Sequence, residues 1–450
     1  MKRIIGSGSL YFSILLFAFS ISFTPVKAQS LLNSDSAFKA AVPNSGRIWG
    51  YVFGDFYYKG HADSLNRGGA NQYTGIPTGR NAFQFRRLYL GYDYNISNKF
   101  STELLLAAED NFPAFNPPSS NAASGDQLLN NKETFFIKLA NIRWKNVWKG
   151  TDLVIGEQAT PTYVAMSERI WNYRSIERTI TDVRRTPSYD MGAGLQGVFD
   201  PATRNFGYNL LVATGNSDKP ASNSFKWFYG DIYYWFLNKK LVVDLYADYE
   251  RLNWSSTWHH DRQMLKGFVS YNTQALTIGV EGYVNTLRND TRAYLGGGNG
   301  SDTINTAARG ISFFVHGDIV PNKLRFFARV DTYNPNKNVG SDSAYAALSS
   351  PSGYGTGSYK ATYNNTGAVA SVTSLGDITS KETFFTIGLD FTPYKDVHFE
   401  PNIWYNHYKS QLATVPGMSA GNSDANSDIV YRMTFFFVFG KHYKNTYNQF

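Results

Sequence analysis

The sequence contains no cysteine among its 450 residues. This absence excludes a disulfide framework, a thiolate metal site and a lipid anchor on a cysteine. Charged side chains are also scarce, at 17% of residues, and aromatic side chains are almost as frequent, at 16%. Beyond residue 29 no long apolar run occurs. The mature chain therefore lacks the stretch of about 20 apolar residues that a membrane-spanning helix needs, and a helical membrane protein is excluded.

The first 28 residues have the organisation of a cleaved export signal. Lys2 and Arg3 precede an apolar run from Leu10 to Phe23, and Ala28 supplies a small residue at the cleavage position. The apolar run is short for a membrane anchor. Removing the three basic residues of this segment lowers the formal charge from +8 to +5 (8 minus 3). That charge is too small to argue for a nucleic-acid partner.

Most of the remaining chain alternates apolar and polar residues with a period of two, and it is rich in β-branched and aromatic side chains. Such segments are typical of strands. The pattern predicts sixteen strands, near 47–59, 82–95, 99–109, 133–145, 152–158, 189–199, 204–214, 225–237, 240–251, 263–272, 275–286, 308–319, 323–333, 381–392, 396–408 and 428–440.

The connections between these segments alternate in length. Short links such as ISNK (96–99) and PYKD (393–396) alternate with long ones such as 159–188 and 334–380. Tight turns at one end and long loops at the other are typical of an outer-membrane barrel. We predict an all-β fold, a transmembrane antiparallel β-barrel of about 16 strands with short periplasmic turns and long extracellular loops. It would span 47–450, after a signal peptide over 1–28 and an N-terminal periplasmic segment over 29–46.

The alternation also predicts which side chains face lipid. In residues 241–250, Leu245 and Ala247 fall on one face, and Asp244, Tyr246 and Asp248 on the other. A charge facing lipid at the middle of the membrane costs about 2–4 kcal/mol, so charged residues are expected to face the interior. Tyrosine and tryptophan gather near strand ends, as expected for the two membrane interfaces.

Two stretches resemble the phosphate-selective porin family (porins O and P) of Gram-negative outer membranes. In 153–199, Gly156, Gln158 and Pro161 are followed by Glu177-Arg178 and the glycine-rich strand 189–199, and FRRLYLGYDYNISNKF (85–100) is similar to the family's second and third strands. The resemblance implies a trimeric porin whose third long loop folds inward. It also implies that the terminal aromatic residue, Phe450, is recognised by the barrel assembly machinery. At Thr162-Tyr163 the chain departs from the family pattern, and phosphate selectivity does not carry over.

The third long loop carries the strongest candidate site. Read as a helix, the loop places Arg174, Arg178 and Arg185 on one stripe and Tyr173, Ile176, Ile180 and Val183 on the opposite one. The functional interpretation is an apolar face packed on the inner wall and a cationic face at the pore constriction, where arginines attract anions. The candidate constriction residues are Arg169, Arg174, Arg178, Arg184 and Arg185. The alternative is a surface loop whose arginines pair locally with Glu168, Glu177 and Asp182.

Basic residues are also expected on the inner wall. The candidate pore-lining residues are Arg87, Lys138, Arg325, Arg329 and Arg432. Acidic residues outnumber basic ones on the same face; they are Asp55, Asp93, Glu103, Asp231, Asp244, Asp248, Glu281, Asp318, Asp390 and Glu400. The structural interpretation of this wall is cross-strand ion pairing.

Four other motifs are weaker. GAGLQG (192–197) fits a dinucleotide-binding pattern, but no strand-to-helix unit surrounds it, so it is interpreted as part of a strand. DANSD (424–428) has calcium-like spacing without the glycine and the distal glutamate. His259 and His260 are interpreted as an exposed loop tip rather than a metal site. His316 near inward Ser312 is only suggestive of a hydrolase.

The function predicted from these features is an outer-membrane porin, a water-filled channel for passive diffusion of small hydrophilic solutes, with anions such as phosphate as candidate solutes. The expected partners are outer-membrane lipid, the solutes, the barrel assembly machinery and two further copies in a homotrimer, with no nucleic acid. No metal, cofactor or catalytic residue is predicted. The alternatives are an outer-membrane barrel enzyme and a surface receptor or adhesin that uses the 334–380 loop.

Overall fold

The computed structural model describes residues 43–440 except 64–67, 69–70, 75, 110–127, 130–131, 185–186, 218, 222, 255–258, 295–300, 339–360, 364–368, 373–379 and 412–426. The predicted signal peptide and most of the predicted 29–46 segment lie outside the described residues. Within the described residues, no helix has the length and apolar character needed to cross a membrane.

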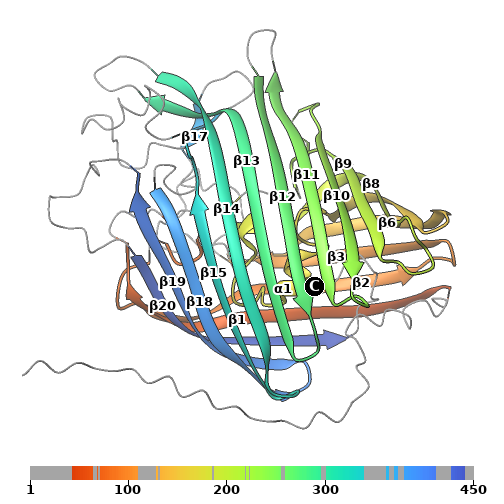
Figure 1. The fold of residues 1–450 in the computed structure, drawn as a ribbon, viewed down its shortest axis with the longest axis horizontal. Helices are drawn as coiled ribbons and strands as arrows, with labels where there is room; N and C mark the ends of the chain where they lie inside the picture. Colours follow the sequence, from red (N-terminus) through yellow and green to blue (C-terminus); the bar gives the residue numbers. More distant parts are fainter. Residues whose placement is uncertain are drawn as a thin grey trace, which may run out of the picture.

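Sixteen antiparallel strands form one closed barrel, as predicted (Figure 1). Each barrel strand pairs with its neighbours along the chain, and the ring closes where β1 pairs with β20. The barrel strands are β1 (Ser45–His61), β2 (Asn81–Asn95), β3 (Phe100–Glu109), β6 (Phe136–Trp148), β7 (Thr151–Ala159), β8 (Tyr189–Val198), β9 (Phe206–Ala213), β10 (Trp227–Phe236), β11 (Leu241–Trp254), β12 (His259–Asn272), β13 (Leu276–Tyr294), β14 (Ser301–Val320), β15 (Leu324–Asn334), β18 (Ser380–Tyr394), β19 (Val397–Ser410) and β20 (Ser427–Gly440).

The remaining elements are short. Two separate hairpins are formed by β4 (Leu128–Leu129) with β5 (Lys132–Glu133), and by β16 (Ala361–Tyr363) with β17 (Val369–Val372). The helices α1 (Ser167–Trp171) and α2 (Ile180–Arg184) both belong to the connection between β7 and β8. Figure 1 shows α1 and its yellow segment inside the ring of strands.

The strand boundaries agree with the expected ones within a few residues in most cases. The barrel begins at Ser45 rather than at 47. The largest differences occur in one hairpin, where β13 extends to Tyr294 and β14 begins at Ser301, against the expected 286 and 308. Pairing resumes there beyond a register shift, from Thr291 opposite Ile304 onward. This hairpin therefore projects further than the sequence pattern predicts.

The two faces of the wall differ as the alternation predicts. On β11, Leu245 is 54% exposed and faces outward, whereas its neighbours Asp244 and Tyr246 are buried in the interior. The same arrangement holds on β12, where Leu265 is exposed and Lys266 is buried. An apolar outer face around a polar interior is the arrangement that lipid stabilises and water does not.

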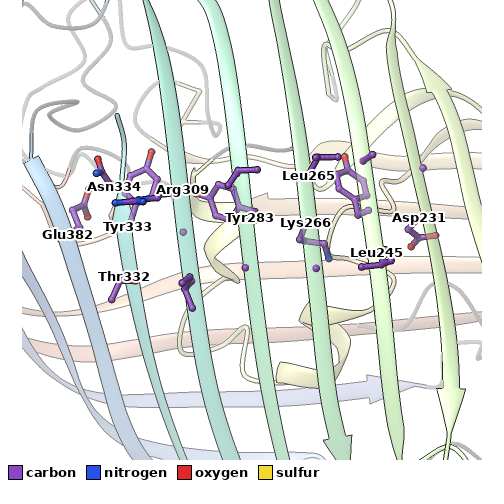
Figure 2. A pocket seen from close by; sticks show the side chains of 18 of the residues that line it. Asp231, Leu245, Leu265, Lys266, Tyr283, Arg309, Thr332, Tyr333, Asn334 and Glu382 are labelled. Carbon is purple, nitrogen blue, oxygen red and sulfur yellow. The ribbon is translucent and has the colours of Figure 1, made fainter. Parts of the chain in front are cut away.

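The apolar outer wall contains a groove of about 1010 Å³ that extends from β9 to β18 (Figure 2). Leucines such as Leu245 and Leu265 line it, together with the glycines Gly230, Gly267 and Gly282. A Cβ atom added at Gly267 or Gly282 would approach no other atom more closely than 3.9 Å. The wall is thin at these three positions because an outward glycine carries no side chain.

Two glycines on β13 provide a matched test of this asymmetry. A Cβ at inward Gly279 would lie 2.2 Å from the Phe314 ring, whereas a Cβ at outward Gly282 would lie 3.9 Å from Gly310 O, an ordinary contact distance. We therefore expect Gly279→Ala to lower the free energy of unfolding by about 1–3 kcal/mol through overpacking. We expect Gly282→Ala to change it much less. Urea titration of the barrel refolded in detergent measures both values, and equal values for the two variants would contradict the assigned faces.

Candidate channel constriction

The described part of the connection between β7 and β8, residues 160–184 and 187–188, lies inside the barrel and is here called the internal loop. Its α1 helix ends at Asn172, which adopts a left-handed conformation with φ of 59°. Arg174 and Arg178 lie between the two short helices, so the prediction that one helix carries the arginine stripe is wrong. Asparagine tolerates this backbone conformation better than most residues, which explains the break at this position.

Apolar side chains hold the internal loop against the inner wall, as expected. Trp171 is fully buried and packs on Phe314 and Phe327, with ring centroids 5.2 and 6.4 Å away. Tyr173 packs against Phe327 with the two rings tilted and their centroids 4.6 Å apart. The predicted apolar residues Tyr173, Ile176 and Ile180 are all buried in clusters with wall side chains. Large buried aromatic side chains supply much of the energy of such packing.

Three wall arginines also hold the internal loop, by donating hydrogen bonds to its backbone carbonyls. Arg86 on β2 donates to Ser175 O at 2.7 Å. Arg432 on β20 donates to Ile176 O at 3.1 Å, and Arg329 on β15 donates to Arg178 O at 2.6 Å. We call these three residues the clamp arginines. Arg329 and Arg432 are predicted to line the pore; their guanidinium groups donate to the internal loop, and the pore-lining role stays a prediction.

Arg86 was not predicted, because strict alternation places only Arg87 on the inner face. The pairing between β1 and β2 shifts register here, with Phe53 opposite Arg87 and Gly54 opposite Phe85. Arg86 is thus the extra residue of a β-bulge, which allows two consecutive side chains to point inward. Both arginines are buried, at 3% and 4% exposure.

The arginines of the internal loop are paired with its own acidic residues. Arg174 Nη1 contacts Glu168 and lies 2.7 Å from Asp182 Oδ2. Arg178 lies 3.8 Å from Asp182 Oδ1 and 3.9 Å from Glu177 Oε1. This local pairing agrees with the alternative interpretation of the loop, in which its arginines pair with Glu168, Glu177 and Asp182. That interpretation placed the loop on the surface, whereas the loop lies inside the barrel. The internal loop therefore presents a compact charge cluster rather than a bare cationic face.

The other predicted loop residues contribute less to this cluster. Arg169 lies on α1, is partly buried and interacts electrostatically with Tyr233. The side chain of Arg184 and the whole of Arg185 lie outside the described residues. The constriction role of these arginines remains a prediction.

Two carboxylates share Arg174, and their pKa values differ as a result. Burial raises the pKa of Glu168 from its usual 4.5 to about 7, and the Asp182 charge adds to this, although Arg174 opposes both. Burial also acts to raise the pKa of Asp182, but the Arg174 and Arg178 charges outweigh it and lower the pKa. The cluster therefore holds a carboxyl group that exchanges a proton near neutral pH.

The remaining predicted basic residues of the wall pair with acidic residues. Such ion pairing is the structural interpretation of the charged inner wall. Arg87 and Lys138 both contact Glu109, with Arg87 Nη1 at 2.7 Å from Oε2. Arg325 lies 2.9 Å from Asp318 Oδ1.

Between α2 and the wall lies a small cavity of about 10 Å³. Its lining residues are Asn71, Glu177, Ile180, Val183, Arg329, Asp331, Tyr333, Glu382 and Phe384. Such a space holds about one water molecule.

The weaker motifs have structural explanations. GAGLQG lies within β8, as predicted. His259 and His260 begin β12 rather than forming a loop tip, and consecutive strand residues point to opposite faces. Asp424 and Asn426 lie outside the described residues, whereas Asp428 pairs with buried Lys59 at 2.5 Å.

The suggested hydrolase pair does not form. His316 Nε2 lies 3.0 Å from Ile170 O, and the Arg325 guanidinium contacts its Nδ1 at 3.1 Å. Both ring nitrogens are thus engaged with groups other than Ser312. A general base needs a free nitrogen within hydrogen-bond reach of the nucleophile, so this site lacks the arrangement for nucleophilic catalysis.

Comparison with solved structures finds the same barrel in outer-membrane channels. An anion-selective porin from Comamonas acidovorans matches with a TM-score of 0.52 and 12% identity, covering 88% of this chain and 100% of that chain. The outer membrane channel DcaP of Acinetobacter baumannii matches with a TM-score of 0.54 and 11% identity, covering 89% of this chain and 99% of that chain. No protein family's sequence pattern and no curated protein matches the chain. The likeness shows a porin-type barrel and does not single out the phosphate-selective family.

Proposed function

We propose that this protein is an outer-membrane porin, a water-filled channel for passive diffusion of small hydrophilic solutes. The observation that carries the proposal is the internal loop, which occupies the interior of a closed barrel and is attached to its wall at several points. A loop that narrows a charged lumen makes a filter for size and charge. The lumen belongs to a barrel whose outer surface suits lipid, with the short turns on the periplasmic side.

We further propose a preference for anions. The internal loop brings Arg169, Arg174 and Arg178 into the lumen. At a narrow point the effective dielectric constant is lower than in bulk water, so each charge acts more strongly there than on a wide, hydrated wall. A phosphate-like or carboxylate solute would share the planar guanidinium donors of Arg174 and Arg178 with the acidic residues of the internal loop. The Comamonas protein, described as an anion-selective porin, is a precedent for anion preference on this fold.

Reconstitution in a planar lipid bilayer tests the proposal. The purified barrel should conduct without any cofactor, and a salt gradient should give a zero-current potential of the sign expected for anion preference. Arg174→Ala with Arg178→Ala should shift this potential toward cations, because Glu168, Glu177 and Asp182 would lose their partners. Arg288→Ala is the control, because that side chain is 52% exposed and pairs with Asp261 at the far end of β12.

The absence of conduction would rule out the channel, and conduction with cation preference would rule out only the anion proposal. Two rival functions remain as alternatives, an enzyme on a barrel scaffold and a receptor or adhesin. For the enzyme, the occupied nitrogens of His316 remove the candidate catalytic pair. Most of the 334–380 loop lies outside the described residues.

Export through a cleaved signal peptide, insertion by the barrel assembly machinery and assembly as a homotrimer complete the proposal. Chemical cross-linking of intact outer membranes would test the trimer.

A further inference from the structure

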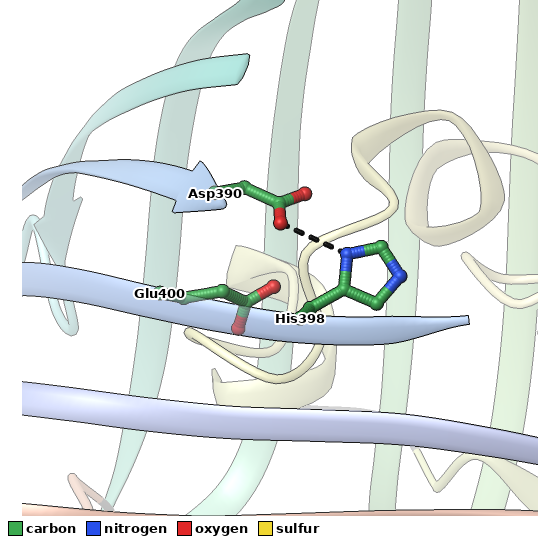
Figure 3. Close-up of side chains that lie close together, drawn as sticks. All are labelled: Asp390, His398 and Glu400. Carbon is green, nitrogen blue, oxygen red and sulfur yellow. Dashed lines mark hydrogen bonds and ion pairs between the residues drawn. The ribbon is translucent and has the colours of Figure 1, made fainter. Parts of the chain in front are cut away.

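Three side chains of the β18–β19 hairpin meet on the inner wall (Figure 3). Asp390 comes from β18, and His398 and Glu400 come from β19 on the other side of a short turn. His398 Nδ1 lies 2.9 Å from Asp390 Oδ1, and one nitrogen or oxygen atom from each of the three residues lies within 4.8 Å of the others. His398 and Glu400 are two apart on one strand, so both point to the same face.

This cluster contains an unsatisfied acceptor. Glu400 is 1% exposed, and its buried Oε2 atom has no hydrogen-bond partner among the residues that the structure describes. The Ser175 hydroxyl of the internal loop bonds the same carboxylate. A buried carboxylate oxygen without a donor costs free energy, because it has lost its water without gaining a partner. The second oxygen of Glu400 is therefore available to a ligand.

Among the described residues, no lysine or arginine forms an ion pair with Asp390 or Glu400, and the pair with Asp390 comes from His398. The nearby Arg325 pairs with Asp318 at 2.9 Å. Arg432 donates instead to Asn402, the Tyr73 hydroxyl and the loop carbonyl of Ile176. Two neighbouring buried carboxylates without a permanent positive partner are unfavourable unless a proton or another cation joins them.

We propose that Asp390, His398 and Glu400 bind a divalent transition metal ion such as Zn²⁺. One imidazole nitrogen and two carboxylates form a nitrogen and oxygen ligand set that suits Zn²⁺, whereas Mg²⁺ and Ca²⁺ prefer oxygen ligands alone. For metal–ligand bonds of about 2.1 Å, two adjacent ligand atoms lie roughly 3.0–3.4 Å apart. The 2.9 Å spacing of His398 Nδ1 and Asp390 Oδ1 is close to this range. The ion would replace the proton between those atoms.

The surroundings favour ordered ligands and an open coordination position. The His398 ring stacks on Phe436, with centroids 5.2 Å apart, which restrains its rotation. The same side chain is 23% exposed, so the cluster has access to solvent. The Tyr173 hydroxyl donates to Asp390 Oδ2 at 3.3 Å. Because Tyr173 and Ser175 both belong to the internal loop, bound metal would connect the wall to the segment that the clamp arginines hold.

Metal binding by the untagged, full-length protein in detergent tests the inference. After chelator treatment and dialysis, calorimetry with Zn²⁺ should show one site per chain, and Co²⁺ should produce visible absorption bands. His398→Ala should abolish those bands, and Glu400→Gln should weaken Zn²⁺ binding by more than about tenfold, since even indirect support of a ligand is worth that much. His407→Ala should bind like the unaltered protein, because His407 lies on the same strand but stacks on Tyr405, away from the cluster.

Heat-modifiable migration in gels identifies the variants that fold. If only one of His398→Ala and Glu400→Gln folds, its metal binding is enough to compare with that of the unaltered protein. Metal binding that is unchanged in a folded variant would overturn the inference, as would an unaltered protein that binds neither ion. Loss of binding in His407→Ala would point to adventitious surface binding and would also overturn it. The binding measurement requires no conduction, so its failure is distinct from failure of the proposed channel.

Discussion

Replacing two clamp arginines, Arg86→Met with Arg432→Met, should raise the single-channel conductance severalfold and make the current noisier. Both side chains donate to carbonyls of the internal loop, at 2.7 and 3.1 Å. A hydrogen bond from a charged donor contributes about 1.5–3 kcal/mol, so the double change would weaken loop attachment by about 3–6 kcal/mol if the effects add. A difference of that size moves a loop conformation from rare to common.

Methionine is the appropriate replacement because it keeps much of the length and the packing surface of arginine while removing every donor. Asp55, which lies 3.5 Å from Arg86, keeps hydrogen bonds from Tyr73 and Thr434, so its buried carboxylate is not left unpartnered. No carboxylate pairs directly with Arg432 among the described residues. The fold should therefore survive, and heat-modifiable migration of the double variant checks this.

Arg325→Met is the matched control. It also removes one positive charge from the inner wall, but its partners are Asp318 and His316, both on β14. If conductance depends only on wall charge, the conductance of this control should equal that of Arg86→Met alone or of Arg432→Met alone. If the clamp arginines act by holding the loop, only their variants should show large and fluctuating currents. Conductance of the double variant equal to that of the control would contradict the clamp.

The barrel follows from the sequence because lipid imposes a strong local rule. On β11, every second residue must be apolar because a polar side chain that faces lipid costs a large transfer free energy. The sequence alone therefore indicates that Leu245 faces outward and Asp244 inward, without information on which residues they contact. The rule fails where a bulge adds a residue. Arg86 and Arg87 both point inward, and a register shift between β3 and β6 leaves both Lys138 and Leu139 buried. Bulges are not encoded in a simple alternation.

The alternation of apolar and polar residues does not predict the contacts of the internal loop. The bond from Arg432 to Ile176 joins residues 256 positions apart, and that from Arg86 to Ser175 joins residues 89 positions apart. Such pairs depend on how far each strand is staggered, which the hydrophobic pattern does not specify. The acidic partners of Arg174 were visible in the sequence, whereas His398 was missed although Asp390 and Glu400 were both assigned to the inner face. Counting inward histidines along with inward acids would have found it.

The ion preference of the proposed channel should depend on pH because of Glu168. Burial raises the pKa of this carboxyl group to about 7. Lowering the pH from about 8 to about 6 should therefore neutralise Glu168 and add nearly one positive charge to the internal loop. The zero-current potential in a salt gradient should move further toward anion preference over this interval. Facing Glu168 are Arg174, Asp182 and Tyr163 of the loop, and Arg87 and Tyr51 of the wall.

The same shift predicts the direction of the stability change. Because the folded-state pKa of Glu168 lies above its usual 4.5, the folded protein binds the extra proton between those two values. Stability contributed by this group is therefore greatest at low pH and is lost as the pH rises through about 7. Urea titrations at pH 5.5 and pH 8 would detect this loss as a lower unfolding midpoint at the higher pH. The difference between the two midpoints should be smaller in Glu168→Gln.

Two variants of the same loop separate the titration of Glu168 from other effects. Glu168→Gln should show strong anion preference at every pH, with little change between pH 6 and pH 8. Burial acts to raise the pKa of Glu177, but Arg178 and Arg86 outweigh it and lower the pKa, so that group stays ionised over this interval. Glu177→Gln should therefore shift the preference by a constant amount and keep the pH dependence. A pH dependence that persists in Glu168→Gln would assign the titration to another group and remove Glu168 from the selectivity mechanism.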